Sequence, residues 1–224
     1  MNKSLPIVVL DPGHGGHDSG AIGPSGLKES DMSLDVCLRA KRILEGILDV
    51  RLTRETDILL NLSERPAIAN VLRAKAFVSY HFNAGSSQNT ALSWEVFTTL
   101  GQNRSDALAT CIGDEHAKLP LGQSSRTDMS DGDIDKEVNF SVIRLTNCPS
   151  CLMEGEFIHT RHGEDLIKKP FNRELMALAV AKGLCKFLGV PFTTPEPIIT
   201  AHVSDRLTLE ERVFLLESKV FPTK

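Results

Sequence analysis

Two histidines and one glutamate in this sequence could bind a metal ion. His14 lies in the glycine-rich segment VVLDPGHGGHDSGAIG, residues 8–23, and His81 lies near the end of a later apolar segment. Glu29 comes just before a segment with helical spacing of apolar residues. Two imidazoles and one carboxylate are a ligand set for zinc that leaves a fourth position open to water, as catalytic zinc sites require. Glycine lets other groups approach the backbone closely, so the loop around His14 could fold tightly around a bound species.

The spacing of these three residues leaves a second interpretation open. An HExxH motif on a helix brings its ligands together locally, whereas His14, Glu29 and His81 are far apart in the sequence. A single histidine is more often exposed or part of a core, and a glutamate beside Lys28 is more often a solvated charge. From spacing alone, the three residues could therefore be unrelated.

The surrounding segments predict an α/β fold. Apolar runs predict strands at residues 5–10, 49–53, 76–82, 93–99 and 150–158. Apolar residues at helical spacing predict helices at residues 32–48, 63–74, 105–117 and 175–188. Ser30 or Asp31 is available as the N-cap of the first helix, and Gly189 lies where the last helix should end. This alternation predicts a largely parallel or mixed sheet flanked by helices on both faces, with a site at the carboxyl ends of the strands. His14 and His81 both lie at such ends.

Length and composition limit the classes of function. The 224 residues are 41% hydrophobic and 24% charged, and the formal net charge is −4 with lysine and arginine scattered along the chain. We therefore expect a folded protein and no nucleic-acid partner, because nucleic-acid-binding proteins carry clustered positive charge. No run approaches the roughly 18 apolar residues of a membrane span, and no signal peptide is visible at the start. The five cysteines, an odd number, predict reduced thiols and synthesis in the cytoplasm.

The end of the sequence predicts an extension to the main domain. We place the main domain at residues 1–190, a proline-containing linker at 191–206 and a short amphipathic helix at 207–224. Thr208 and Glu211 match a capping box. The apolar residues of this helix recur on one side, at Leu209, Val213, Leu216 and Val220. Such a stripe predicts either docking onto the body of the same chain or self-association.

Three segments, in this order, resemble the signature blocks of one enzyme family. They are VVLDPGHGGHDSGAIGPSGLKES, FVSYHFNA and LMEGEFI, with support from LTRETD, LSERPAIAN and VIRLTNCPSCLME. Over roughly residues 7–189 the chain resembles the zinc-dependent N-acetylmuramoyl-L-alanine amidases of the Amidase_3 family, which are peptidoglycan hydrolases. The resemblance implies the α/β fold of that family, with the main domain as the catalytic domain. It also implies one zinc ion per chain, bound by His14, Glu29 and His81.

The last of these blocks contains two acids. The resemblance implies that Glu154 is the catalytic glutamate, but Glu156 lies two residues further along the predicted strand, where its side chain would point to the same face. Glu156 is therefore a rival for the catalytic base, although the family pattern supports Glu154. The family commonly continues into Ser-Asn, whereas this chain has His159 and Thr160. We assign no ligand role to the remaining histidines, which are His17, His116, His159, His162 and His202.

The resemblance implies cleavage of the amide between the lactyl group of N-acetylmuramic acid and the L-alanine of the stem peptide. Zinc would make water a nucleophile at neutral pH, and Glu154 would take its proton and deliver it to the departing nitrogen. The alternative is a catalytically inactive amidase-like protein that binds the cell wall or a partner. Because peptidoglycan lies outside the cytoplasmic membrane, an active enzyme would reach it by lysis, a holin, as phage endolysins do, or specialised secretion.

The segment NCPSC, residues 147–151, is the main competing motif. A CxxC pair can indicate redox catalysis or half of a zinc site. In redox proteins of the thioredoxin type the pair opens a helix, whereas Cys148 and Cys151 lead into a predicted strand. A four-thiolate site would need a second CxxC, which the sequence lacks. We therefore predict a structural role for both cysteines.

Overall fold

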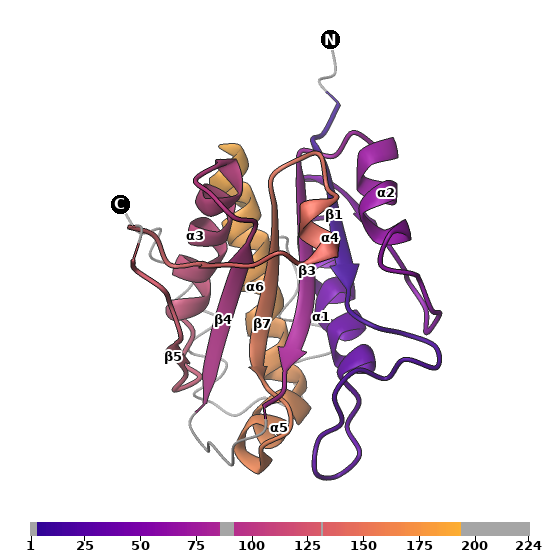
Figure 1. Cartoon of the computed structure of the whole chain (residues 1–224), viewed down its shortest axis with the longest axis vertical. Helices are drawn as coiled ribbons and strands as arrows, with labels where there is room; N and C mark the ends of the chain where they lie inside the picture. The colour runs from indigo at the N-terminus through magenta and orange to yellow at the C-terminus, as the bar shows by residue number, and fades with distance from the viewer. Residues whose placement is uncertain (1–3, 86–91, 131, 194–224) are drawn as a thin grey trace.

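The computed structural model of the chain describes residues 4–85, 92–130 and 132–193 (Figure 1). Its strands are β1 (Ile7–Pro12), β2 (Asp49–Leu52), β3 (Ala76–Asn83), β4 (Ser93–Thr98), β5 (Ser124–Ser125), β6 (Lys136–Glu137) and β7 (Ser150–Phe157). Its helices are α1 (Glu29–Ile43), α2 (Glu64–Val71), α3 (Arg104–Ala117), α4 (Ser141–Arg144), α5 (Arg161–Lys168) and α6 (Pro170–Leu188). The predicted helix at 207–224 and most of the predicted linker lie outside the described residues.

The strands form a mixed sheet in the order β2-β1-β3-β7-β4-β5, and β6 also pairs with β4. Strands β2, β1, β3 and β7 run parallel, whereas β4 is antiparallel to β7. The carboxyl ends of β1, β3 and β7 therefore meet at one edge of the sheet. This arrangement confirms the predicted α/β fold and the predicted location of His14 and His81 at strand ends.

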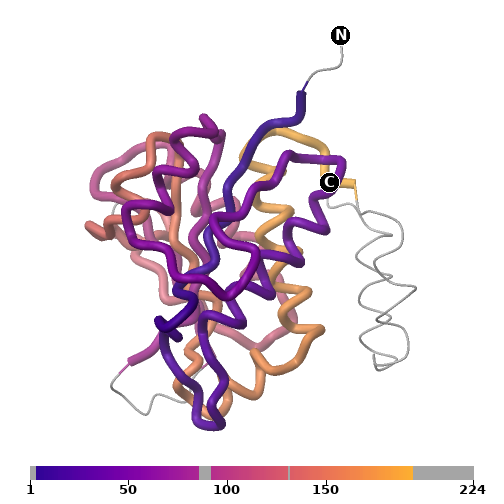
Figure 2. The backbone as a smooth tube through the Cα atoms, turned by 90° about the vertical axis from the view of Figure 1, so that its right-hand side faces the viewer, coloured from indigo at the N-terminus to yellow at the C-terminus, as the bar shows by residue number. Residues whose placement is uncertain are grey.

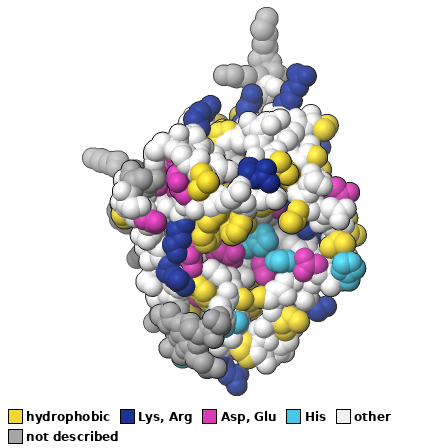
Figure 3. All heavy atoms as spheres, viewed as in Figure 1, with side chains coloured by type: hydrophobic (Ala, Val, Ile, Leu, Met, Phe, Trp, Pro, Cys, Tyr) yellow, Lys and Arg dark blue, Asp and Glu magenta, His cyan; other side chains and the backbone are white. Residues whose placement is uncertain are grey.

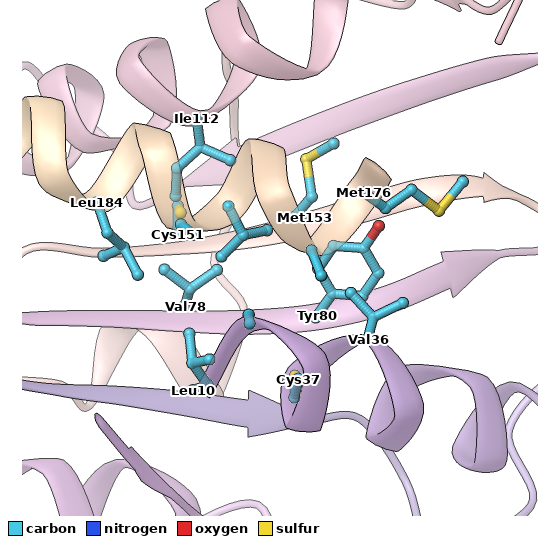
Figure 4. Packing of buried hydrophobic residues seen from close by; sticks show 14 of the residues in the cluster. Leu10, Val36, Cys37, Val78, Tyr80, Ile112, Cys151, Met153, Met176 and Leu184 are labelled. Atoms are coloured by element: carbon cyan, nitrogen blue, oxygen red, sulfur yellow. The ribbon is translucent and has the colours of Figure 1, made fainter. Parts of the chain in front are cut away.

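Helices cover both faces of the sheet, as predicted (Figure 2). On one face, strand residues such as Val8 and Val78 pack against α1, α3 and α6 in the larger hydrophobic core. Figure 4 shows this packing around Tyr80, Met153 and Met176. On the other face, strand residues of the opposite parity form a smaller core with α2 and α4.

Helices α1 and α6 begin three and five residues earlier than the sequence predicts. Helix α1 begins at Glu29, and neither Ser30 nor Asp31 is its N-cap, so that prediction is wrong. The backbone N–H groups of Glu29 and Ser30 instead donate to the carbonyls of Ala21 and Ser19, 2.9 and 3.1 Å away. The glycine-rich loop thus replaces a side-chain cap and joins its own backbone to the first turn of α1. Helix α6 begins at Pro170, and Gly189 ends it in the left-handed conformation, as predicted.

Within the part of the chain that the structure describes, no helix is long and apolar enough to cross a membrane. All five cysteines are free thiols. Cys151 is buried at the start of β7, and burial raises the pKa of Cys148 to about 11. A thiol with a raised pKa holds little of the reactive thiolate at neutral pH, which supports a structural role for this pair.

Candidate active site

The glycine-rich loop that follows β1 brings its backbone unusually close to the side chains of the site. An added Cβ at Gly13 would lie 2.3 Å from the His81 ring, and one at Gly20 would lie 2.5 Å from the His14 ring and 2.6 Å from the Glu29 carboxylate. Gly20 also has a positive φ of 63°, as does His14 at 58°. A side chain larger than hydrogen at these two glycines would displace the candidate ligands, which explains the glycine content around His14.

His14, Glu29 and His81 come together although they belong to separate segments. One potential ligand atom from each lies within 4.8 Å of the other two. Glu29 Oε1 is 2.8 Å from His81 Nδ1 and 3.1 Å from His14 Nε2. The three side chains therefore form a group that could hold a metal ion, which spacing alone did not establish.

Backbone and side-chain contacts fix the orientation of this group. Phe82 N–H donates to Glu29 Oε1, and Ala21 N–H donates to Glu29 Oε2, at 3.1 and 2.9 Å. On the outer side, Asp18 Oδ2 lies 2.9 Å from His14 Nδ1. A carboxylate on the second nitrogen of an imidazole fixes the ring's orientation and makes the first nitrogen a better ligand. Asp18 is thus a supporting residue that sequence reasoning missed, although it lies in the same loop.

The electrostatics favour an ionised Glu29. Its burial disfavours the charge, but the contacts with His14 and His81 outweigh burial and hold its pKa well below the ordinary value. The donor set is then one carboxylate oxygen and two imidazole nitrogens, which is a set typical of zinc sites. The residues present therefore fit a zinc ion.

Glu154 lies beside this group, on the neighbouring strand. In the sheet it is the register partner of His81 on one side and of Glu95 on the other. Its Oε2 atom is buried and has no hydrogen-bond partner among the described residues. Burial, followed by the charges of Glu29 and Glu95, raises the pKa of Glu154 well above its ordinary value. Glu154 is therefore a carboxyl group suited to hold a proton.

Glu156 does not share this environment. The register between β3 and β7 shifts after Glu154, because His81 pairs with Glu154 whereas Asn83 pairs with Phe157. An extra residue in β7 breaks the two-residue alternation that predicted the same face for both acids. Glu156 is fully buried, and its carboxylate accepts hydrogen bonds from the N–H groups of Ser93 and Phe157. Its environment favours a structural role.

Three buried charged residues hold the loop that carries His14, and sequence reasoning did not single them out. Arg65 donates to Asp11 Oδ1 at 2.9 Å and to the His14 carbonyl at 2.8 Å. Arg54 donates to the carbonyls of Gly13 and Ser30, at 2.7 and 2.8 Å. These arginines occur in the segments LTRETD and LSERPAIAN, so the family resemblance was the available signal.

A cavity of about 240 Å³ opens beside the candidate ligands. His14 and His81 line it together with apolar side chains from the segment before α2, such as Leu59 and Leu62. Histidine and acidic side chains gather in a hollow on this face of the molecule (Figure 3). A substrate could therefore approach His14 and His81 from solvent.

The other histidines do not join the group. His17 and His162 are exposed, and His116 is buried against Trp94, with 5.3 Å between ring centroids. His159 lies against Phe157 at 5.7 Å. His202 lies outside the described residues.

Comparison with known proteins identifies the family. The family model Amidase_3, described as N-acetylmuramoyl-L-alanine amidase, matches residues 8–186. The chain belongs to the Amidase_3 family. This membership confirms the resemblance of the three sequence blocks, and the matched residues include all four candidate site residues.

Similar proteins include chromosomal and phage amidases. The N-acetylmuramoyl-L-alanine amidase AmiC of Neisseria meningitidis is 30% identical, over 84% of this chain and 54% of its own length. The endolysin of Bacillus phage SPP1 is also 30% identical, over 82% of this chain and 66% of its own. The chain thus spans about half to two thirds of these two relatives.

Solved structures share the fold of this Amidase_3 chain. The amidase AmiC2 of Nostoc punctiforme has a TM-score of 0.75 at 32% identity, covering 82% of this chain and 97% of its own. The catalytic domain of CwlV, an amidase from Bacillus (Paenibacillus) polymyxa, has a TM-score of 0.74 at 29% identity. That match covers 84% of this chain and all of the CwlV domain, so the described region corresponds to a whole catalytic domain there.

Proposed function

We propose that the chain is a zinc-dependent N-acetylmuramoyl-L-alanine amidase. It hydrolyses the amide between the lactyl group of N-acetylmuramic acid and the L-alanine of the peptidoglycan stem peptide. The observation that carries this proposal is the convergence of His14, Glu29 and His81 next to Glu154, in a chain of the Amidase_3 family. Relatives and solved structures that are named as such amidases support it.

In this proposal His14, Glu29 and His81 hold one zinc ion. When bound, zinc acts as a Lewis acid and makes water a nucleophile at neutral pH. Glu29 contributes the negative charge, and its hydrogen bonds from the backbone of Phe82 and Ala21 keep its carboxylate in place. Asp18 keeps the His14 ring turned so that Nε2 faces Glu29. The chain thus arranges its ligands before the metal binds.

Glu154 moves the proton. Its Oε2 atom, buried and without a hydrogen-bond partner among the described residues, accepts a proton from the attacking water. The same atom then donates that proton to the amide nitrogen, because an amine must be protonated to leave. Burial and the charges of Glu29 and Glu95 raise its pKa, so once the ionised carboxylate has accepted the proton it holds it more firmly than an ordinary carboxyl group until the transfer to nitrogen.

Mass analysis of the products tests this function. The zinc-loaded chain is incubated with purified peptidoglycan, and Glu154→Gln is the matched control. We expect free stem peptides with an amino-terminal L-alanine from the wild type, and a release from the variant that is slower by roughly 10²-fold or more. Cleaved glycan strands or cleaved peptide crosslinks would contradict the proposal. A wild type that retains wall binding but releases no fragment would favour the inactive binding protein.

The substrate sets where the chain would act. Peptidoglycan lies outside the cytoplasmic membrane, so we infer that the chain works on the extracytoplasmic cell wall. Release by a holin or by lysis is consistent with its similarity to the SPP1 endolysin, and specialised secretion is the alternative. The purified chain is added to intact cells and to cells with a permeabilised membrane. This comparison shows whether the chain reaches peptidoglycan from outside the cell or only once the membrane is permeable.

A further inference from the structure

A second cluster of carboxylates lies at the edge of the sheet opposite the candidate active site. Asp106 is in the first turn of α3, and Asp133 and Asp135 lie just before β6. One potential ligand atom from each of the three lies within 4.8 Å of the other two. Asp106 and Asp135 are only 6% and 2% exposed. The chain thus places three acids together where water reaches two of them poorly.

Each acid is fixed by one of its oxygens. Asp106 Oδ2 accepts from the Asn103 N–H at 2.6 Å, in the capping box of α3. Asp133 Oδ2 accepts from Gln102 Nε2 at 3.0 Å, and Asp135 Oδ2 accepts from the Thr98 hydroxyl. The three side chains are therefore held in place from outside the cluster and cannot easily turn away from one another.

The remaining oxygens of Asp133 and Asp135 point to a ligand. Both Oδ1 atoms are buried and have no hydrogen-bond partner among the described residues. Lys136, the next residue in the chain, turns away and pairs with Glu95 at 2.5 Å. A buried carboxylate oxygen without a donor or a counter-charge is costly, so a carboxylate with such an oxygen normally binds a cation or becomes protonated.

We propose that Asp106, Asp133 and Asp135 bind a hard divalent cation of the calcium class. The donor set is all oxygen and anionic, which suits calcium and does not suit zinc, whose sites use nitrogen and sulfur. The alternative is that the acids share protons. Burial and the neighbouring Asp133 raise the pKa of Asp135 to about 7, so the cluster is close to protonation when no cation is present.

Such an ion would join the segment before β6 to two elements that lie about thirty residues earlier in the sequence, β4 and α3. It would tie the segment before β6 to the first turn of α3 and, through the bond between Asp135 and Thr98, to the end of β4. Lys136, which follows Asp135 in the sequence, forms an ion pair with Glu95, and Glu95 is the register partner of Glu154. The ion would therefore stabilise the segment that places a positive charge beside the candidate catalytic strand.

The single tryptophan of the chain provides a direct probe. Ile134, which separates Asp133 from Asp135, packs beside Trp94: an added Cβ at Gly113 would lie 2.3 Å from Ile134 Cδ1 and 3.2 Å from the Trp94 ring. Terbium(III) prefers the same oxygen ligands as calcium, and its emission is sensitised by a nearby indole. Terbium is therefore titrated into the zinc-loaded full chain, with excitation of Trp94, and calcium is added as the competitor.

We expect terbium emission that rises to saturation as terbium is added and that falls when calcium displaces the terbium. Asp135→Asn and Asp133→Asn should each weaken terbium binding at least tenfold, whereas Asp128→Asn, an exposed acid in the same segment, should leave it unchanged. If Asp135→Asn does not fold, the less buried Asp133 supplies the test. The proposal is overturned if the wild type shows no sensitised emission, if calcium does not compete, or if both cluster variants bind like the wild type.

Discussion

Acidification should destabilise the chain through one buried histidine. His116 lies in α3 and is 1% exposed, with its ring 5.3 Å from that of Trp94. Its Nε2 atom lies 3.1 Å from Gln123 Oε1, and its Nδ1 atom has no partner among the described residues. Burial lowers the pKa of His116 from 6.5 to about 4, because the interior does not solvate an imidazolium. The folded chain therefore keeps this ring neutral at pH values where the unfolded chain protonates it.

The sign and size of the effect follow from this difference. Below the unfolded pKa of 6.5 the unfolded state binds one more proton, so the free energy of unfolding falls as the pH falls, until the folded pKa of about 4 is reached. Each pKa unit corresponds to about 1.4 kcal/mol, which gives a loss of about 2 kcal/mol between pH 7 and pH 5. Other groups titrate in this window, so the effect must be measured as a difference between variants.

Urea unfolding at pH 7 and at pH 5, followed by Trp94 fluorescence, measures this loss in the free energy of unfolding. His116→Gln removes the titrating group and should lose about 2 kcal/mol less than the wild type between the two pH values. His162→Gln, at an exposed position, is the matched control and should lose as much as the wild type. If the wild type and His116→Gln show the same pH dependence, the buried ring is not neutral in the way its surroundings indicate.

Four further predictions concern the site and the chain end. Glu154→Gln should lower kcat by roughly 10²-fold or more with zinc still bound, because the amide cannot carry the proton; near-normal kcat would assign the role elsewhere. Chelation should abolish peptidoglycan hydrolysis, and zinc should restore it with about one ion per chain by metal analysis; restoration by magnesium alone would contradict the ligand set. Gly20→Ala should weaken zinc binding in a metal titration, because the methyl group overlaps His14. Gly26→Ala is its control, because Gly26 also has a positive φ but a Cβ there meets nothing within 4 Å. Equal losses of zinc affinity in the two variants would implicate backbone strain alone. Truncation after Pro191 should leave hydrolysis of soluble muropeptides intact but lower the melting temperature or the oligomer mass; if neither changes, the last residues are a passive tail.

Local patterns predicted the frame of the molecule well. The alternation of apolar strands and helices predicted a mixed α/β sheet with helices on both faces, and the structure confirms it. The same alternation placed His14 and His81 at the carboxyl ends of two strands, where the crevice of a parallel sheet lies; that these two strands are neighbours is seen only in the structure. Gly189 ends α6 as predicted, since glycine adopts without strain the left-handed conformation found there. These features depend on contacts that are local or periodic in the sequence.

Features that depend on distant contacts were not predictable from local patterns. The start of α1 is set by carbonyl groups of Ser19 and Ala21, which no capping rule for side chains takes into account. The environment of Glu156 depends on a register shift between β3 and β7, which the spacing of two acids in one strand does not reveal. The contacts of Arg65 with Asp11 likewise appear only once the segments are folded together.

The two acids nearest the candidate zinc site differ in a way that supports separate roles. Glu29 touches both imidazoles, and these contacts outweigh its burial and lower its pKa. Glu154 has no such partner for Oε2, and burial together with the charge of Glu29 raises its pKa. A carboxylate that binds the metal must keep its negative charge through the reaction. A carboxylate that carries a proton must be able to become neutral. Neighbouring carboxyl groups whose surroundings move their pKa values in opposite directions are the pattern expected of such a division. The contacts of Glu29 with the histidines therefore prepare it as a ligand, and its negative charge also helps Glu154 to hold a proton.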